Sequence, residues 1–371
     1  MPRISRKGSG SGLQAFKREF DADRDSSVFK EMIPQKKHVL CVKRSSTAVR
    51  RFAARLVRLA LVLLAALLYL GFAPLLHGAH EGLQSHPDPT ADYAEAVSRF
   101  RRIQKMEGPE LNPVCRSILL THGRRTERAV VFFHGISNCP QQFNQLGHIF
   151  YDMGYNVLIP RLPRHGMADR KVENLSPLKA EELFDCADAS VDIACGLGQK
   201  VYVAGLSAGG TLAAWIAQNR TEVTRVVLIA PALGFSRYKG ARVQQGIALL
   251  LRLLPDIRIN WFDAPDHAYP GVSSRALGQL LRVSVATFAR ALNRAPGVQD
   301  VALVTSKSDK EVSDLLAWQL IGLWRSKGLF KFTAVDFPKE MKIEHDKIDP
   351  AQKNQQIEIV YPVLVSLLNA P

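Results

Sequence analysis

A strand, a tight turn and a helix follow one another at residues 201–218, and the turn carries the pattern Gly205-x-Ser207-x-Gly209. A serine on a sharp strand-to-helix turn needs small neighbours, because the backbone there is strained and passes close to the helix. Such a turn presents the Ser207 hydroxyl as a nucleophile. It also aims the Ala208 amide at the place where an oxyanion forms. A glycine-rich turn with an idle serine is the alternative.

Predicted strands and helices alternate along the chain from about residue 114. Apolar runs predict strands at 115–120, 129–133, 156–160, 226–229, 301–305 and 331–337, and helical patterns occupy 141–152, 180–194 and 357–368. This alternation predicts the α/β class, with a mostly parallel sheet that is covered by helices on both faces.

Three motifs occur in a fixed order: His134-Gly135 at a strand end, His165-Gly166 in a loop, and the Gly-Leu-Ser-Ala-Gly-Gly turn around Ser207. In this order they resemble the α/β-hydrolase superfamily, in particular its branch of monoacylglycerol lipases, carboxylesterases and serine aminopeptidases. The resemblance covers roughly residues 110–370 and implies an α/β-hydrolase domain at 111–371.

The resemblance also implies a catalytic triad in the chain order Ser, Asp or Glu, then His. Of the histidines after Ser207, His345 follows the last predicted strand, whereas His267 precedes the later strands. Asp309 follows the strand at 301–305, three residues before a valine, and is the expected acid. Glu311 and Asp314 are the fall-backs, expected on the next helix with side chains that point away from the base. A helix N-cap for Asp309 and a surface loop for His345 are the alternatives.

The resemblance places a second oxyanion donor in the loop after His134-Gly135. Because glycine lets a backbone approach closely, the amide of Ile136 is the expected donor beside that of Ala208. Ser137 or Asn138 could add a further hydrogen bond. His134 itself is expected to be structural.

Residues 233–297 interrupt the sheet pattern and contain no obvious strand, so the resemblance implies a helical cap over the site. Within it, residues 246–255 are apolar at nearly every position. A helix packed into the body is one interpretation. A wall of an acyl-binding pocket, or a face that contacts lipid, is the other.

The net charge of +15 belongs mainly to the amino-terminal tail, because residues 1–58 hold 15 Lys and Arg against 5 Asp and Glu. The uncharged run at 59–76 follows and is just long enough to span a bilayer as a helix. The positive-inside rule then predicts a cytoplasmic tail and a domain on the extracytoplasmic, periplasmic side. A cleaved signal peptide and a buried core helix are the alternatives. The tail lacks a nucleic-acid-binding pattern, and residues 77–110 are expected to form a linker and a helix.

No metal or cofactor motif is present, so no cofactor is expected. Cys115, Cys139, Cys186 and Cys195 follow the predicted anchor, and a disulfide among them stays open, except that a helix would separate Cys186 from Cys195. The predicted function is a membrane-anchored serine hydrolase acting on a small-molecule or lipid ester. An amide, peptide or thioester hydrolase and a non-catalytic binding protein on the same fold are the alternatives.

Overall fold

The computed structural model describes residues 83–234, 241–261 and 263–370, together with Arg51 and Arg55. The chain divides into two compact units, Met1–Tyr69 and Leu70–Pro371. Apart from those two arginines, the predicted tail and the predicted anchor at 59–76 lie outside the described residues. Within the described ranges, no helix has the length and apolarity that a membrane crossing requires.

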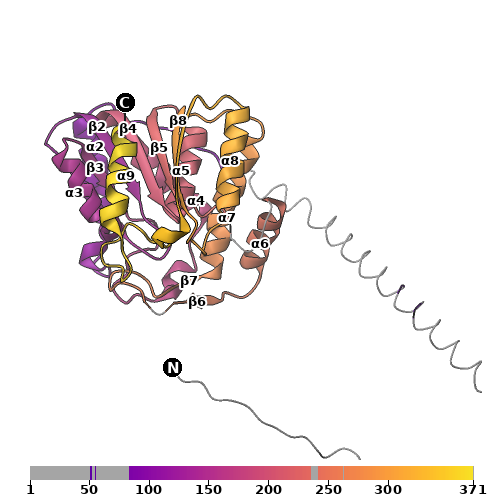
Figure 1. Cartoon of the computed structure of the whole chain (residues 1–371). Helices are drawn as coiled ribbons and strands as arrows, with labels where there is room; N and C mark the ends of the chain where they lie inside the picture. Colours follow the sequence, from indigo (N-terminus) through magenta and orange to yellow (C-terminus); the bar gives the residue numbers. More distant parts are fainter. Residues whose placement is uncertain (1–50, 52–54, 56–82, 235–240, 262, 371) are drawn as a thin grey trace, which may run out of the picture. The chain divides into compact units, whose positions relative to one another are not determined.

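A seven-stranded sheet forms the centre of the second unit, with the spatial order β1-β3-β2-β4-β5-β8-β9 (Figure 1). Its strands are β1 (Ile118–Leu120), β2 (Thr126–Phe133), β3 (Asn156–Ile159), β4 (Gly198–Leu206), β5 (Val223–Ile229), β8 (Asp300–Ser306) and β9 (Lys331–Phe337). Neighbouring strands run parallel, except that the edge strand β1 pairs antiparallel with β3. The predicted sheet is confirmed, but Cys115 belongs to a short 3-10 helix before β1.

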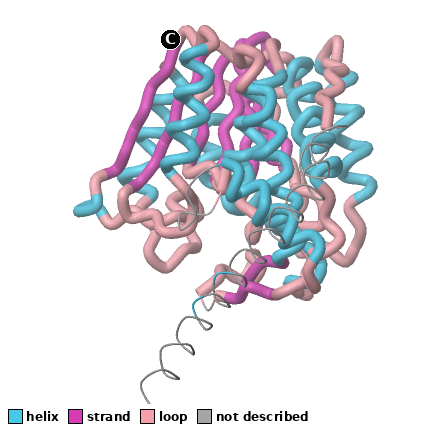
Figure 2. Tube along the Cα trace, turned by 90° about the vertical axis from the view of Figure 1, so that its right-hand side faces the viewer, coloured by secondary structure: helices cyan, strands magenta, loops and turns pink. Residues whose placement is uncertain are grey.

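Helices cover both faces of this sheet (Figures 1 and 2). α3 (Asn144–Asp152) and α9 (Ile357–Asn369) contribute to the hydrophobic core on one face. The core on the other face includes α2 (Tyr93–Met106), α4 (Ala180–Leu197), α5 (Ala208–Asn219), α7 (Ser274–Ala291) and α8 (Asp314–Ser326). Successive residues of a strand point to opposite faces, so Phe132 joins the first core and Phe133 the second. Burial on both faces explains why the strand sequences are continuously apolar.

The insertion after β5 is not all-helical, in contrast to the expectation from the sequence. It contains α6 (Ala241–Leu253) and a two-stranded antiparallel sheet of β6 (Arg258–Asn260) and β7 (Gly271–Ser273), which lies apart from the main sheet in Figure 1. The last helix of the predicted cap is α7, which packs against α6 of the insertion and also against the body helices α5, α4 and α8. Three-residue strands carry too little periodicity to be recognised in a sequence.

The segment expected to be a linker is packed against the domain from Leu83 onward. Leu83 and Thr90 are buried, and α4 carboxylates accept hydrogen bonds from the hydroxyl of Ser85 and the backbone amide of Asp88. The fully buried Arg220 pairs with the same carboxylates, those of Asp188 and Asp192. The positive charge of Arg220 balances the negative charges of the two carboxylates inside the protein. The same carboxylates also accept the hydrogen bonds from Ser85 and Asp88 that hold the segment before α2.

Candidate active site

Ser207 lies at the turn between β4 and α5, where its backbone adopts φ 58° and ψ −112°. This backbone conformation is unfavourable for any residue other than glycine. Residues held in unfavourable conformations concentrate at functional sites. The Ser207 amide donates to Ile229 O at 3.0 Å, which helps to hold the turn against β5. A Cβ atom at Gly205 would lie 2.2 Å from Gly209 O, and one at Gly209 would lie 1.9 Å from Phe133 O. Both glycines are therefore required by close backbone approaches.

His345 and Asp309 come from two loops beyond the carboxyl ends of the last two strands. Asp309 Oδ2 lies 2.7 Å from His345 Nδ1. Asp309 Oδ1 accepts backbone hydrogen bonds from Glu311 at 2.9 Å and Val312 at 3.3 Å. Ser313, not Asp309, caps α8. The Asp309 side chain is completely buried, whereas that of His345 is 10% exposed.

The ionised form of Asp309 is strongly favoured. Burial alone would raise its pKa, but the hydrogen bond and charge of His345, together with the charge of Lys347, lower the pKa to about 2. For His345, burial lowers the pKa, but the hydrogen bond and charge of Asp309 outweigh burial, so that the pKa lies above its ordinary value. Asp309 can thus hold the imidazole in one tautomer and stabilise an imidazolium.

Glu311 and Asp314, the two alternative candidates for the acid, lie in different positions relative to α8. Glu311 precedes α8 rather than lying on it, and its Oε2 is 3.9 Å from Nε2 of His345, the opposite side of the ring from Asp309. The expectation that its side chain points away from the base is therefore wrong. Asp314 is the first residue of α8 and its Oδ1 is buried. Burial and the neighbouring charge of Asp309 raise the pKa of Asp314 to about 6.

Two cavities meet at Ser207 and His345. One, of about 430 Å³, extends over polar side chains, and the other, of about 390 Å³, over apolar ones. Five residues line both: Ile136, Ser207, Trp261, Glu311 and His345. The imidazole and the hydroxyl therefore face one shared space of a size typical for ligand sites.

The amides of Ile136 and Ala208 donate to no acceptor among the described residues. The Ile136 amide is oriented through its own peptide group. Gly135 O accepts from the Asn138 amide at 3.1 Å and lies 2.9 Å from His134 Nδ1. The Gly135 carbonyl and the Ile136 N–H belong to one trans peptide group and point in opposite directions. Because the carbonyl faces Asn138 and His134, the Ile136 N–H points away from these two residues. The Leu162 amide donates to His134 Nε2, which fixes the tautomer of this buried ring.

One expectation about residues 134–139, the candidate oxyanion loop, needs correction. It is not the expectation for Gly135: a Cβ atom there would lie 3.7 Å from its nearest neighbours, in Gln142, so packing within the described residues leaves room for a side chain, and the close approach to a substrate stays a prediction. The Asn138 side chain is buried and donates to Asp349 Oδ2 at 2.9 Å, so this amide group is not available to a substrate. Ser137 does line the polar cavity.

A polar network that the sequence analysis did not identify links the oxyanion loop to the loop of His345. The Gly135 amide donates to Gln142 Oε1 at 2.8 Å, and Gln142 Nε2 donates to Asp346 Oδ2 at 2.9 Å. Gln352 donates to the same Asp346 oxygen. These side chains are polar residues inside segments that were predicted only as a helix or a loop, and no spacing pattern marks them.

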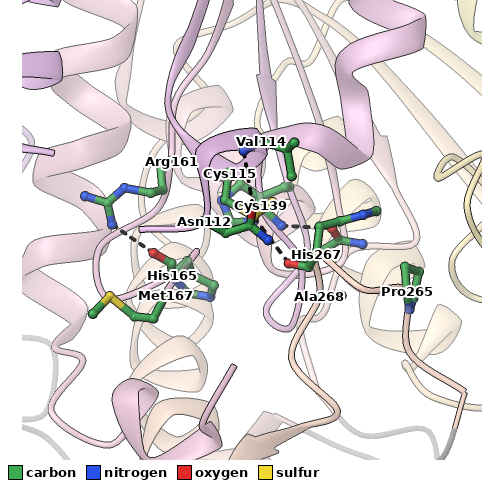
Figure 3. Close-up of a disulfide and its surroundings, with 12 residues drawn as sticks. Asn112, Val114, Cys115, Cys139, Arg161, His165, Met167, Pro265, His267 and Ala268 are labelled. Carbon is green, nitrogen blue, oxygen red and sulfur yellow. Dashed lines mark hydrogen bonds between the residues drawn. A yellow bond between two sulfur atoms is a disulfide. The ribbon is translucent and has the colours of Figure 1, made fainter. Parts of the chain in front are cut away.

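The insertion is attached to the same region. His267 Nε2 lies 2.8 Å from Asp349 Oδ2, and the Tyr269 amide donates to Ser137 O. Figure 3 shows the Cys115–Cys139 disulfide beside His267, whose carbonyl oxygen lies 3.3 Å from Cys115 Sγ. The sequence left this pairing open. Cys186 and Cys195 are free and lie on α4, as the helix argument required.

Across residues 83–234, 241–261 and 263–370, no group of His, Cys, Asp or Glu side chains is arranged to hold a metal ion.

The comparisons with known proteins concern the family and the fold. A model of the alpha/beta hydrolase family matches residues 130–338, more than half of the chain. A thermostable monoacylglycerol lipase from Bacillus sp. strain H-257 is 28% identical over 167 residues, which are 43% of this chain and 63% of the lipase. The chain thus spans less than two thirds of the length of that relative.

Solved structures show the same fold at low identity. A metagenome-derived lipolytic enzyme is 16% identical with a TM-score of 0.54, covering 70% of this chain and all of that one. A monoacylglycerol lipase from Paleococcus ferrophilus is 18% identical with a TM-score of 0.51, covering 68% and 97%. A soluble variant of the Saccharomyces cerevisiae monoglyceride lipase, solved with a substrate analogue, is 12% identical with a TM-score of 0.52, covering 68% and 90%. Because the family model matches more than half of its length, this chain belongs to the alpha/beta hydrolase family.

Proposed function

We propose that this protein is a membrane-anchored serine hydrolase that cleaves a carboxylic ester with an apolar acyl group. The observation that carries the proposal is the 2.7 Å contact between Asp309 Oδ2 and His345 Nδ1 beside a cavity that Ser207 also lines. An oriented imidazole that lines the same cavity as a serine on a sharp turn can activate that hydroxyl for nucleophilic attack.

In the proposed reaction, His345 Nε2 removes the proton of Ser207, and the serine oxygen attacks the ester carbonyl. The amides of Ile136 and Ala208 hold the oxyanion, an interaction typically worth about 10²–10³ in rate per donor. His345 then protonates the departing alcohol, which leaves an acyl-serine. A water molecule, deprotonated by His345, attacks the acyl-serine and releases the acid, and the proton returns to Ser207.

The two cavities support a substrate with two unlike halves. The 390 Å³ cavity suits an acyl chain, because it is lined by Ile259, Trp261, Val272, Leu277, Leu280 and Leu281. The 430 Å³ cavity suits a polar alcohol, because Glu344, Gln352, Lys353 and Asn354 line it. Lipase and esterase names among the similar proteins point to the same bond type.

An exposed apolar surface beside the acyl cavity supports a lipid substrate. It consists of Leu250, Leu253, Leu254, Ile257 and Ile259, which run from α6 to β6. Ile259 belongs to both this surface and the wall of the acyl cavity. Leu250, Leu253 and Leu254 lie at helical spacing at the end of α6. Exposed apolar side chains gathered in this way favour an interaction site, which would let an acyl chain pass from a lipid phase into the cavity.

The anchor at 59–76 and the extracytoplasmic location are part of this proposal. The Cys115–Cys139 disulfide supports them, because disulfides persist in oxidising compartments. A reporter enzyme fused after residue 76 should behave as exported, and the full chain should resist carbonate extraction. Release of the intact chain by carbonate would contradict the anchor without affecting the proposed chemistry.

The chemistry is tested with a fluorophosphonate probe and Ser207→Ala. We expect wild-type protein to be labelled and the variant to lose labelling while it keeps its melting temperature. A panel of p-nitrophenyl esters from acetate to decanoate, run beside aminoacyl amides, should show ester cleavage with a preference for longer acyl groups. Labelling that survives in Ser207→Ala would contradict the proposed nucleophile, and cleavage of the amides alone would contradict the ester assignment.

A further inference from the structure

Lys347 lies under the candidate triad and has no role in the proposed reaction. Its side chain is completely buried, two residues after His345. The ammonium nitrogen has no hydrogen-bond partner among the described residues. Its close ionic contact is Asp309, at 3.8 Å from Nζ to Oδ2. A lysine that gives up its hydration without gaining a hydrogen bond is costly to the fold, so its position calls for an explanation.

Carboxylates from three segments of the chain act on this ammonium. Asp309 and Glu311 come from the loop after β8, Asp314 from the start of α8, and Asp346 from the same loop as Lys347. Burial lowers the pKa of Lys347, and the charges of Asp309, Asp314, Asp346 and Glu311 oppose that change. Lys307, which is paired with Asp336, adds a cation near Asp314 from the end of β8.

The decisive geometric feature is a shared oxygen. Asp309 Oδ2 lies 2.7 Å from His345 Nδ1 and also 3.8 Å from the ammonium nitrogen of Lys347. The other oxygen, Oδ1, is occupied by two backbone amides. One carboxylate oxygen therefore serves two cationic partners, one of which takes up and releases a proton in each half of the proposed reaction.

We propose that Lys347 is a positioning residue: its buried ammonium shares the Asp309 carboxylate with His345 and thereby limits how firmly that carboxylate holds the imidazolium. This inference rests on the proposed function of the triad. A base that stays protonated cannot accept the Ser207 proton, so catalysis near neutral pH needs an imidazole that is oriented by Asp309 but not excessively basic. Lys347 supplies that balance from the side of the carboxylate that no substrate reaches.

The sign of the effect follows from the charges. An adjacent cation disfavours the imidazolium, so removal of Lys347 raises the pKa of His345. The free-base form then appears only at higher pH. For Lys347→Met we expect kcat/KM to fall about threefold to tenfold at pH 6 and to stay within about twofold of wild type at pH 9, because only the protonation equilibrium of the base changes.

The experiment measures kcat/KM against pH for the full-length protein in detergent, with p-nitrophenyl butyrate as the substrate. Lys327→Met is the matched control, because Lys327 is an exposed lysine at the far end of α8 and the change removes the same charge. The double variant Lys347→Met/Asp314→Asn is used in case Lys347→Met alone folds poorly. Because it removes one buried cation and one buried anion, its melting temperature should return to that of wild type. The acid limb of its kcat/KM profile should still lie at higher pH than in wild type.

A second readout is independent of activity. NMR titration of the His345 imidazole, in protein labelled at histidine Cε1, should show a higher pKa in Lys347→Met than in wild type and no change in Lys327→Met. An unmoved or downward-shifted titration would overturn the role of Lys347, even in a fully active enzyme. Absence of wild-type hydrolysis and probe labelling would instead contradict the proposed function, and the NMR titration would still decide the inference about Lys347.

Discussion

The two sides of the His345 ring differ in their surroundings. On the Nδ1 side, Asp309 and Lys347 are both completely buried, and protein groups surround each charge. On the Nε2 side, Glu311 lies 3.9 Å away but its side chain is 69% exposed, and the ring faces two open cavities. Charges in water are strongly screened, whereas buried charges are screened much less. We therefore expect the buried side to set the chemistry and the open side to set which substrate fits.

Asp309→Asn should have the largest effect, because it removes the charge on the buried side. Asparagine keeps the size but favours the wrong tautomer of the base, a change that costs about 10⁴ in kcat in the serine protease that is the standard example. We expect kcat to fall by about 10²–10⁴ with little change in melting temperature. Activity within tenfold of wild type would show that the buried side does not dominate.

Leu277→Trp tests the open side, because Leu277 lines the apolar cavity and is only partly buried. An indole there should occupy space that a long acyl chain needs. We expect kcat/KM for p-nitrophenyl decanoate to fall about tenfold or more, while acetate stays within about threefold. Leu315→Trp, at an exposed leucine on α8 outside the cavity, is the control. Equal losses for both esters would argue against an acyl site in this cavity.

Glu311→Gln should have a small effect of the opposite sign to Lys347→Met. The anion of Glu311 favours the imidazolium of His345, so its removal lowers the pKa of the base. The acid limb of kcat/KM should then move to lower pH, with the plateau within about twofold, because the side chain is exposed and screened. A loss of tenfold or more at the plateau would instead give Glu311 a direct role in the reaction.

Asp314→Asn should leave activity unchanged and alter only stability. The pKa of Asp314 is raised to about 6 by burial and by the charge of Asp309. The folded state thus favours the protonated Asp314 side chain. The stability that this protonated side chain contributes is fully present below the pKa of the residue in the unfolded chain, and it is lost as the pH rises through about 6. Asparagine mimics that form, so the melting temperature should exceed that of wild type by about 2–4 °C at pH 8. The gain should vanish near pH 4, and a gain that is independent of pH would point to another cause.

Several features of the site could be predicted because they depend on local sequence. The turn around Ser207 requires small residues at fixed spacing, and the structure places Gly205 and Gly209 against backbone atoms that leave no room for a side chain. Asp309 and His345 were expected from the chain order that the resemblance to the α/β-hydrolase superfamily implies, combined with their positions after predicted strands, and the structure brings their side chains together. The alternation of apolar segments was sufficient to predict the sheet.

Other features depend on contacts between distant segments and left no local pattern. Gln142 contacts Asp346, which is 204 residues further along the chain, and Lys347 is buried although lysine is ordinarily a surface residue. The Cys115–Cys139 pairing requires two loops to meet, which spacing alone does not reveal.

The sequence by itself thus determined the class of the fold and the tight turn around Ser207, because backbone geometry and strand periodicity are encoded by neighbouring residues. The family resemblance added the candidates for the base and the acid. Only the tertiary structure decided which cysteines pair, where Glu311 lies relative to His345, and how Lys347 and Asp309 come to share one oxygen. Those outcomes depend on burial and on the distances between charges, which arise only when segments far apart in the chain pack together.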